Sequence, residues 1–240
     1  MDFNSFNLEF DKNLRYNNLE LTQNQAEKFY QYMNNLIEWN NKINLTAIKD
    51  EKEIILKHFT DSIKICDYIE GKRLLDIGSG AGFPGIPVKI MNDELEVTLI
   101  DSVNKKVNFM KDSIEKLNLE KIESIHTRAE EIAYESEYRE KFDTVVSRAV
   151  ANLTTLVEYM LPFVKINGIC ICMKGPNCEE ELNNAKYAIK LLGGEIEKVI
   201  EYKIDDDNNR SIIVIRKKNH TEQTYPRKMG KPIKEPLLKK

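Results

Sequence analysis

The sequence predicts a doubly wound α/β fold with a mainly parallel, seven-stranded sheet. From about residue 72 onward, short apolar runs alternate with amphipathic segments of helical spacing. A loop of alternating glycines follows the first run, and the last two runs follow each other with no helix between them. Alternating strands and helices are typical of a parallel sheet covered by helices, and two consecutive final strands indicate a closing hairpin.

The first 70 residues carry a helical pattern of their own. Thr22 and Gln25 have the spacing of a capping box, and apolar residues then recur at helical intervals as far as Asn40. A second helical stretch runs from about residue 51 to residue 69. We therefore expect a helical extension (1–70) packed on a main domain (71–218), with a basic, proline-containing tail (219–240).

The main domain contains seven predicted strands and three clear helices. An apolar stripe predicts the first helix, over residues 103–117. Two more helices are predicted over residues 151–163 and 179–192, and a pair of glycines ends the second of these. The predicted strands are Arg73–Ile77, Val97–Ile100, Glu123–His126, Thr144–Ser147, Ile169–Met173, Ile196–Tyr202 and Ser211–Arg216.

The loop after the first strand is the strongest functional signal. The strand ends at Asp76, and Gly78, Gly80 and Gly82 follow with the spacing D-x-G-x-G-x-G. Glycines in such a loop let the backbone adopt unusual angles and come very close to a ligand. Nicotinamide-dinucleotide enzymes use G-x-G-x-x-G instead, where the start of a helix holds a pyrophosphate. S-adenosylmethionine has no phosphate, so the spacing here indicates a methyl-donor site.

Two charged residues lie at the carboxyl ends of predicted strands, where ligands bind in such sheets. Asp101 ends the second strand, 23 residues after Gly78, and could accept both ribose hydroxyls of an adenosine. We favour this role over capping of the following helix, for which Ser102 is as good a candidate, although dehydrogenases also use such an acid. Arg148 ends the fourth strand, where its charge needs a carboxylate, phosphate or base as partner. We expect Arg148 to position the substrate.

Composition sets further bounds. The net charge is −3, yet the last 25 residues hold nine Lys or Arg and two Glu, a charge of +7 that leaves −10 for the rest. Such a tail could lie along phosphates or could simply be solvated. No apolar run approaches the ~20 residues of a membrane span, and the first residues do not resemble a secretory signal. We expect a cytoplasmic protein with no membrane contact.

Cysteine and histidine do not indicate a metal site. Cys170 and Cys172 alternate along an apolar run, so both should lie buried on one face of a strand. The four cysteines form no C-x-x-C pair, and the three histidines are scattered. His58, Asp61 and Ser62 are close in sequence, but no nucleophile elbow surrounds the serine, so a hydrolase triad is not indicated.

Several longer motifs together resemble one family over nearly the whole chain. The chain is similar to the bacterial small-subunit (16S) ribosomal RNA guanine-N7 methyltransferases, formerly called glucose-inhibited division protein B. The G-F-P-G-I-P continuation of the glycine loop and the Ser-Arg-Ala after the fourth strand are the most specific features. The motifs are Asn44-Leu45-Thr46, KHFTDSI (57–63), LLDIGSGAGFPGIPVKI (74–90), LIDSVNKKVNFM (99–110), TRAEE (127–131), SRAVANL (147–153), MKG (173–175), RSIIVIRK (210–217) and YPRKMGKPIKEPL (225–237).

The resemblance implies a Rossmann-like class I methyltransferase that uses S-adenosylmethionine and acts on 16S ribosomal RNA or the small ribosomal subunit. We expect a monomer without a metal. The residues implied to line the donor pocket are Gly78, Phe83, Ala129, Glu130 and Arg148, to which the physical argument adds Gly80, Gly82 and Asp101. Candidates for the RNA side are His58, Arg128, Lys174 and Arg210.

What the sequence lacks is compatible with guanine N7 as the acceptor. It has no N/D-P-P-Y/F/W tetrapeptide to hold an exocyclic nitrogen, and no Pro-Cys motif to attack a pyrimidine. Guanine N7 already carries a lone pair and loses no proton, so positioning in line with the donor could suffice. Three alternatives stay open: a methyltransferase of a small molecule or protein, a nicotinamide-dependent dehydrogenase, and a non-catalytic ribosome-assembly factor.

Overall fold

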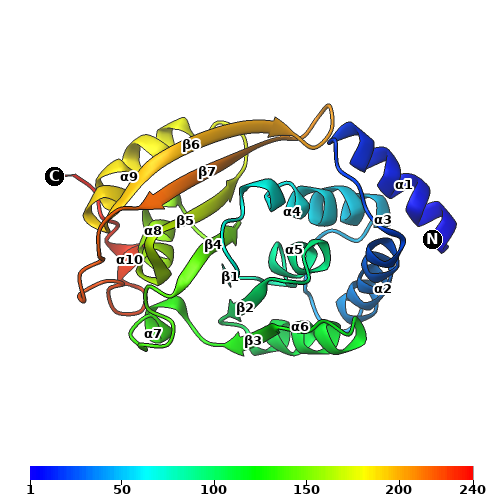
Figure 1. The fold of residues 1–240 in the computed structure, drawn as a ribbon, viewed down its shortest axis with the longest axis horizontal. Helices are drawn as coiled ribbons and strands as arrows, with labels where there is room; N and C mark the ends of the chain where they lie inside the picture. The colour runs from blue at the N-terminus through cyan, green and yellow to red at the C-terminus, as the bar shows by residue number, and fades with distance from the viewer. Residues whose placement is uncertain (240) are drawn as a thin grey trace.

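The computed structural model describes residues 1–239 and contains a seven-stranded sheet between two layers of helices (Figure 1). The strand order is β3-β2-β1-β4-β5-β7-β6; the neighbouring pairs are parallel except the two that contain β7. The predicted doubly wound sheet and its closing hairpin are confirmed. The strands are β1 (Arg73–Ile77), β2 (Glu96–Asp101), β3 (Ile122–His126), β4 (Phe142–Arg148), β5 (Val164–Lys174), β6 (Gly194–Lys203) and β7 (Asn209–Lys217).

Helices cover both faces of the sheet. Besides α-helices, the described residues form one π-helical segment, η1, and two short 3₁₀ turns, η2 and η3. The helical elements are α1 (Phe3–Tyr16), α2 (Gln23–Asn40), α3 (Glu51–Glu53), η1 (Ile54–Thr60), α4 (Asp61–Ile63), η2 (Cys66–Tyr68), α5 (Gly85–Met91), α6 (Asn104–Lys116), α7 (Ala129–Ile132), α8 (Leu153–Met160), η3 (Leu161–Phe163), α9 (Glu179–Leu191) and α10 (Lys231–Lys234).

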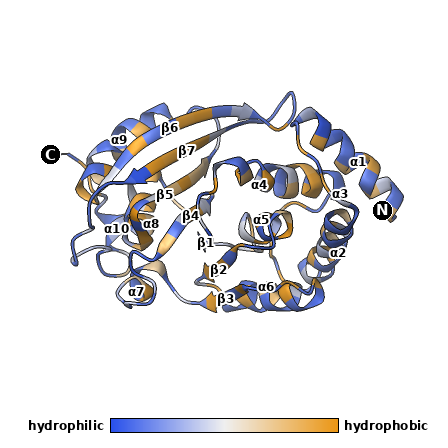
Figure 2. Cartoon of the chain, in the orientation of Figure 1, coloured by the Kyte–Doolittle hydropathy of each residue, from blue (hydrophilic) through white to orange (hydrophobic). Residues whose placement is uncertain are grey.

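Neighbouring residues of a strand serve two separate cores, because successive side chains point to opposite faces. Leu74 of β1 packs with the N-terminal helices, α5 and α6, whereas Leu75 packs with α7, α8 and α9. Cys170 and Cys172 are both fully buried in the second core, as their alternation predicted. In Figure 2, β2 and β5 are hydrophobic over much of their length, whereas α1 and α9 carry alternating hydrophobic and hydrophilic bands.

The N-terminal helices belong to the first core. The capping box of Thr22 and Gln25 is present at the start of α2, as predicted. Helix α1 was not predicted, although Phe6, Phe10 and Leu14 are spaced so that they share one buried face. Edge-to-face contacts join Phe10 to Phe29, with ring centroids 5.2 Å apart. These helices therefore cover one face of the sheet.

The stretch predicted as helical over residues 51–69 is helical in the structure, but it is not one regular α-helix. The chain forms a short α-helical turn, the π-helical segment η1, a second α-helical turn and a 3₁₀ turn. Within this stretch the Thr60 hydroxyl donates to the Ile55 carbonyl, and the Ser62 hydroxyl donates to the His58 carbonyl. A π-helical turn carries an extra residue per turn and occurs frequently at functional sites. It shifts the direction of the side chains that follow.

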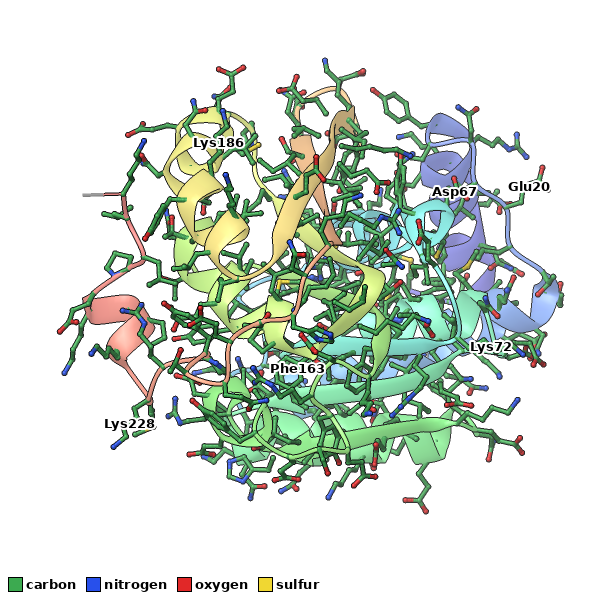
Figure 3. The ribbon with its side chains drawn as sticks, turned by 60° about the vertical axis from the view of Figure 1, so that its left-hand side comes forward. Glu20, Asp67, Lys72, Phe163, Lys186 and Lys228 are labelled. Atoms are coloured by element: carbon green, nitrogen blue, oxygen red, sulfur yellow. The ribbon has the colours of Figure 1, made fainter. Side chains whose placement is uncertain are left out.

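The C-terminal tail is folded against the second helix layer. The guanidinium of Arg139 donates to the main-chain carbonyls of Thr221, Glu222 and Tyr225. The tail then passes α8 and includes α10, which is the red segment beside α8 in Figure 1. Figure 3 shows Lys228 on this segment, with its side chain directed away from the body of the protein.

Candidate active site

The strand order reverses between β1 and β4, where a crevice forms at the carboxyl ends of the strands. Strand β1 pairs in parallel with both β2 and β4. The chain therefore leaves the sheet in opposite directions from two adjacent strands. The glycine loop after β1 and the loop after β4 both start at this edge, as the sequence predicted from the strand ends.

The glycine loop is held firmly from beneath. The Asp76 carboxylate accepts from the Gly85 amide at 2.8 Å, and the Ser79 hydroxyl donates to the Asp76 carbonyl at 2.9 Å. From α2, the fully buried Tyr32 donates its hydroxyl to the Ala81 carbonyl. Burial raises the pKa of Asp76 to about 7. The loop is thus built by the strand and by the N-terminal helices together.

The three glycines of the loop face different surroundings. All have positive φ, +68° at Gly78, +61° at Gly80 and +87° at Gly82, which other residues adopt at a cost. A Cβ on Gly82 would lie 2.4 Å from Ile86 Cδ1, and one on Gly78 would lie 2.4 Å from Val150 Cγ2. A Cβ on Gly80 would meet no atom nearer than 4.0 Å. Open space for a ligand therefore lies over Gly80.

Asp101 is bound to this loop. One carboxylate oxygen accepts from the Gly80 amide at 2.9 Å, and the other accepts from the Val103 amide at 2.8 Å. The side chain is nearly buried, and it lines the crevice. Each carboxylate oxygen has two lone pairs, so Asp101 can support the turn and still accept from a ligand hydroxyl.

A first cavity of about 380 Å³ lies beside the loop. It brings together Gly78, Asp101, Ala129 and Glu130, which the sequence assigned to the donor. It also contains Arg128, which was expected as a candidate for the RNA side. The other lining residues come from the strand ends, from the loop after β4 and α8, and from the C-terminal segment; they are Ile77, Ile100, Ser102, Thr127, Val150, Ala151, Tyr159, Met229, Gly230 and Ile233.

A second cavity of about 290 Å³ lies on the other side of the loop after β4. It contains His58, Lys174 and Arg210, three of the four RNA-side candidates. Arg148, expected in the donor pocket, lies here instead. Gly80, Gly82 and Phe83 do not line either cavity. The remaining lining residues are Ile48, Lys57, Asp61, Ala149, Met173 and Gly175.

Arg148 is fixed between an aromatic ring and a carboxylate. Its guanidinium carbon lies 5.3 Å from the Phe83 ring centroid, and its Nη1 is 3.0 Å from an Asp61 oxygen. The other Asp61 oxygen accepts from the Tyr202 hydroxyl at 2.8 Å, and Arg210 Nε lies 3.8 Å away. The partner that the sequence required for Arg148 is therefore Asp61. Nothing in the sequence indicated that Asp61 or Tyr202 would take part in this arrangement.

His58 is a neutral part of the same wall. Its ring stacks on Phe83 with centroids 4.4 Å apart, and its Nε2 lies 2.9 Å from the Thr46 hydroxyl. Burial, and next the charge of Arg148, lower the pKa of His58 to about 3. The buried Nδ1 has no hydrogen-bond partner in the described chain. At neutral pH, His58 therefore adds shape rather than charge to the second cavity.

The second cavity is cationic. Lys57, Arg148, Lys174 and Arg210 line it, and Asp61 is the carboxylate among its lining residues. Lys174 donates to the Ala151 carbonyl and to the carboxylate of Glu181, both at 2.7 Å. Glu181 does not line the cavity. Within residues 1–239, no cluster of three or more His, Cys, Asp or Glu could hold a metal ion. Nor does that part of the chain include a helix long and apolar enough to cross a membrane.

Solved structures of other proteins share this fold. Magnesium protoporphyrin IX methyltransferase from Synechocystis PCC 6803, with bound SAM, matches with a TM-score of 0.56 at 13% identity, over 82% of this chain and 98% of that chain. TYW2 of P. horikoshii, in complex with MeSAdo, matches with a TM-score of 0.54 at 14% identity, over 66% of this chain and 62% of that chain. This likeness shows the class I methyltransferase fold.

Sequence relatives are much closer. Ribosomal RNA small subunit methyltransferase G of Acetivibrio thermocellus is 52% identical over 91% of this chain and 91% of its own length. The protein of that name from Clostridium botulinum (strain Eklund 17B / Type B) is 49% identical over 91% of this chain and 93% of its own. The model of the family described as rRNA small subunit methyltransferase G matches residues 25–213, from α2 to β7. The chain therefore belongs to the rRNA small subunit methyltransferase G family, as its motifs predicted.

Proposed function

We propose that this protein transfers the methyl group of S-adenosylmethionine to N7 of a specific guanine in 16S ribosomal RNA. One observation carries the proposal: two cavities of different character adjoin each other at the carboxyl edge of the sheet. They share one loop, because Ala149 lines the second cavity whereas Val150 and Ala151 line the first. Transfer of a small group between two bound molecules requires adjoining sites of this kind.

The first cavity fits the donor. Within this cavity, Asp101 would accept from the ribose hydroxyls, and Ala129 and Glu130 would flank the adenine. The methionine part would extend out of the cavity into the open space over Gly80. S-adenosylmethionine, when bound, supplies an electrophilic methyl group and leaves a neutral thioether behind. The chain contributes a fixed loop, whose backbone is set by Asp76 and Tyr32 before any ligand arrives. Such preorganisation lowers the entropic cost of reaching an in-line geometry.

The second cavity fits a nucleotide of RNA. Arg148 presents a planar guanidinium that can donate to guanine or to phosphate, and Asp61 holds it in place. Lys174 and Arg210 add positive charge for the RNA backbone. Because the deep groove of an RNA helix cannot be read by side chains, the guanine must be presented from a loop or be unstacked.

The charges of the second cavity also suit the chemistry at N7. The N7 lone pair attacks the methyl carbon, so no general base is needed, and the neutral His58 is compatible with that. After transfer the guanine ring carries a positive charge. Arg148, Lys174 and Arg210 then disfavour the product over the neutral guanine, which favours release.

The test is methyl transfer from labelled S-adenosylmethionine to small subunits, and to naked 16S RNA, from cells that lack this protein. Label in 7-methylguanosine at one site is the expected result. Comparing the amount of label in the two acceptors shows whether the substrate is the naked RNA or the assembled subunit. Label in another nucleoside would refute N7, and label in neither acceptor with the donor bound would refute the RNA substrate. No donor binding at all would favour a non-catalytic assembly factor. The cytoplasmic location and the monomeric state stay predictions.

A further inference from the structure

The C-terminal segment, residues 227–234, borders the first cavity. Met229, Gly230 and Ile233 belong to its lining, about 70 residues after Tyr159, the preceding lining residue along the chain. Met229 is 61% exposed and Ile233 is 67% exposed, although both are large apolar side chains. Apolar surface beside a cavity gains free energy when a ligand covers it. The segment therefore offers a wall that a flat apolar group would complete.

Contacts with α8 hold this segment on both sides of Met229. Arg227 donates to Glu158 from its amide, Nε and Nη2, at 2.8, 2.9 and 2.7 Å. Beyond the turn, the Thr155 hydroxyl donates to the Pro232 carbonyl at 3.1 Å. Glu158 is fully buried, and a buried carboxylate without its cation is strongly unfavourable. The Glu158–Arg227 pair therefore fixes where the segment crosses the cavity.

The turn between these two anchors depends on Gly230, which has φ of +78°. The left-handed conformation at this position lets the chain reverse directly before α10. As a result Met229, before the turn, and Ile233, after it, both line the cavity. The turn of Arg128–Glu130 lines the same cavity.

We propose that residues 227–234 are part of the donor site: Met229 and Ile233 cover the adenine ring, and the Glu158–Arg227 pair positions them. The purine is the occupant that fits, because Asp101 supplies the acceptor for a ribose and the apolar side chains lie across the same cavity. This inference rests on the proposed binding of the donor in the first cavity. It gives the C-terminal tail a function in binding the methyl donor, which differs from contacting RNA.

The first test measures affinity with the full-length protein. Calorimetry gives the Kd of S-adenosylhomocysteine and of adenosine for the wild type, for Met229→Ser with Ile233→Ser, and for the control Leu238→Ser. Leu238 is a 51% exposed apolar residue of the same tail that does not line the cavity. We expect the double variant to raise both Kd values about tenfold, as expected for the loss of about 1.4 kcal/mol, and the control to leave them unchanged.

The second test examines the anchor. Arg227→Gln and Glu158→Gln should raise the Kd of S-adenosylhomocysteine and also speed tryptic cleavage after Lys228, whose side chain points outward (Figure 3). In the wild type, S-adenosylhomocysteine should slow that cleavage. Faster cleavage with an unchanged Kd would show that the anchor only stabilises the tail, and would refute its positioning role.

The outcomes separate this inference from the proposed function. One outcome is that Gly80→Val abolishes binding of S-adenosylhomocysteine while the Met229 and Ile233 double variant binds it normally. That result would support the proposed donor site and would refute the proposed role of Met229 and Ile233 in it. If the wild type binds neither S-adenosylhomocysteine nor S-adenosylmethionine, the donor site itself is refuted and the wall with it.

Discussion

Replacing Asp61 tests whether this carboxylate holds Arg148 for catalysis. Asp61 is 95% buried and accepts from Arg148 and Tyr202. In Asp61→Asn the amide oxygen can face Arg148, and the Tyr202 hydroxyl can turn to accept from the new NH₂ group. Only the charge is then lost, which costs about 2 kcal/mol in the free energy of unfolding. In Asp61→Ala the Arg148 charge is left unpaired in a mostly buried site, at a cost of about 4 kcal/mol.

The assay combines urea unfolding with steady-state kinetics and donor calorimetry. Because Asp61 lines the second cavity and not the first, both variants should lower kcat for RNA and leave the donor Kd unchanged. Glu38→Gln, which removes an exposed pair with Lys42, is the matched control and should change none of the three quantities. An alanine variant as stable as the asparagine variant, or a weakened donor Kd, would refute the reasoning.

Three further predictions concern the loop, pH and the tail. Tyr32→Phe removes the hydroxyl that supports Ala81; calorimetry should show a higher donor Kd, and urea unfolding a loss of about 1 kcal/mol. The folded-state pKa of His58 lies far below its unfolded value, so its contribution is fully present above pH ~6.5 and is lost as pH falls. Asp76, with its raised pKa, acts in the opposite direction. His58→Gln should therefore retain about 2 kcal/mol more than the wild type between pH 7 and pH 5 in urea unfolding. Lys228→Ala with Lys234→Ala should flatten the dependence of the RNA KM on salt; an unchanged slope would show that the tail does not contact phosphates.

The sheet could be predicted because its strands are short apolar runs separated by clear helical patterns. The predicted bounds of β1 agree with the structure, and β2 differs by one residue at each end. The helical stretch over residues 51–69 could be predicted, but its π-helical turn could not, because helical periodicity does not distinguish a regular α-helix from one with such a turn. The pattern of α1 was present in the sequence, in Phe6, Phe10 and Leu14, and was overlooked.

The candidate site was predictable only as far as the strand ends. Asp101 and Arg148 were expected at one edge of the sheet, and both lie there. Asp101 lines the first cavity and Arg148 the second, and the loop after β4 separates the two cavities. In this loop Ala149 has φ of +57°, a left-handed conformation that the sequence does not predict for alanine. The burial of Glu158, and therefore the position of Arg227, depends on tertiary packing that one sequence does not reveal.

The position of the tail at the first cavity has a consequence for biosynthesis. Chains are made from the N-terminus at about 5–20 residues per second, and domains fold as they emerge. Strand β7 lies between β5 and β6, so the sheet cannot close until residue 217 is available. Met229 and Ile233 arrive later still. On the assignment proposed above, a nascent chain thus acquires a complete donor pocket only when translation has almost ended, and a message cut short before codon 229 would yield a chain that lacks this wall of the pocket.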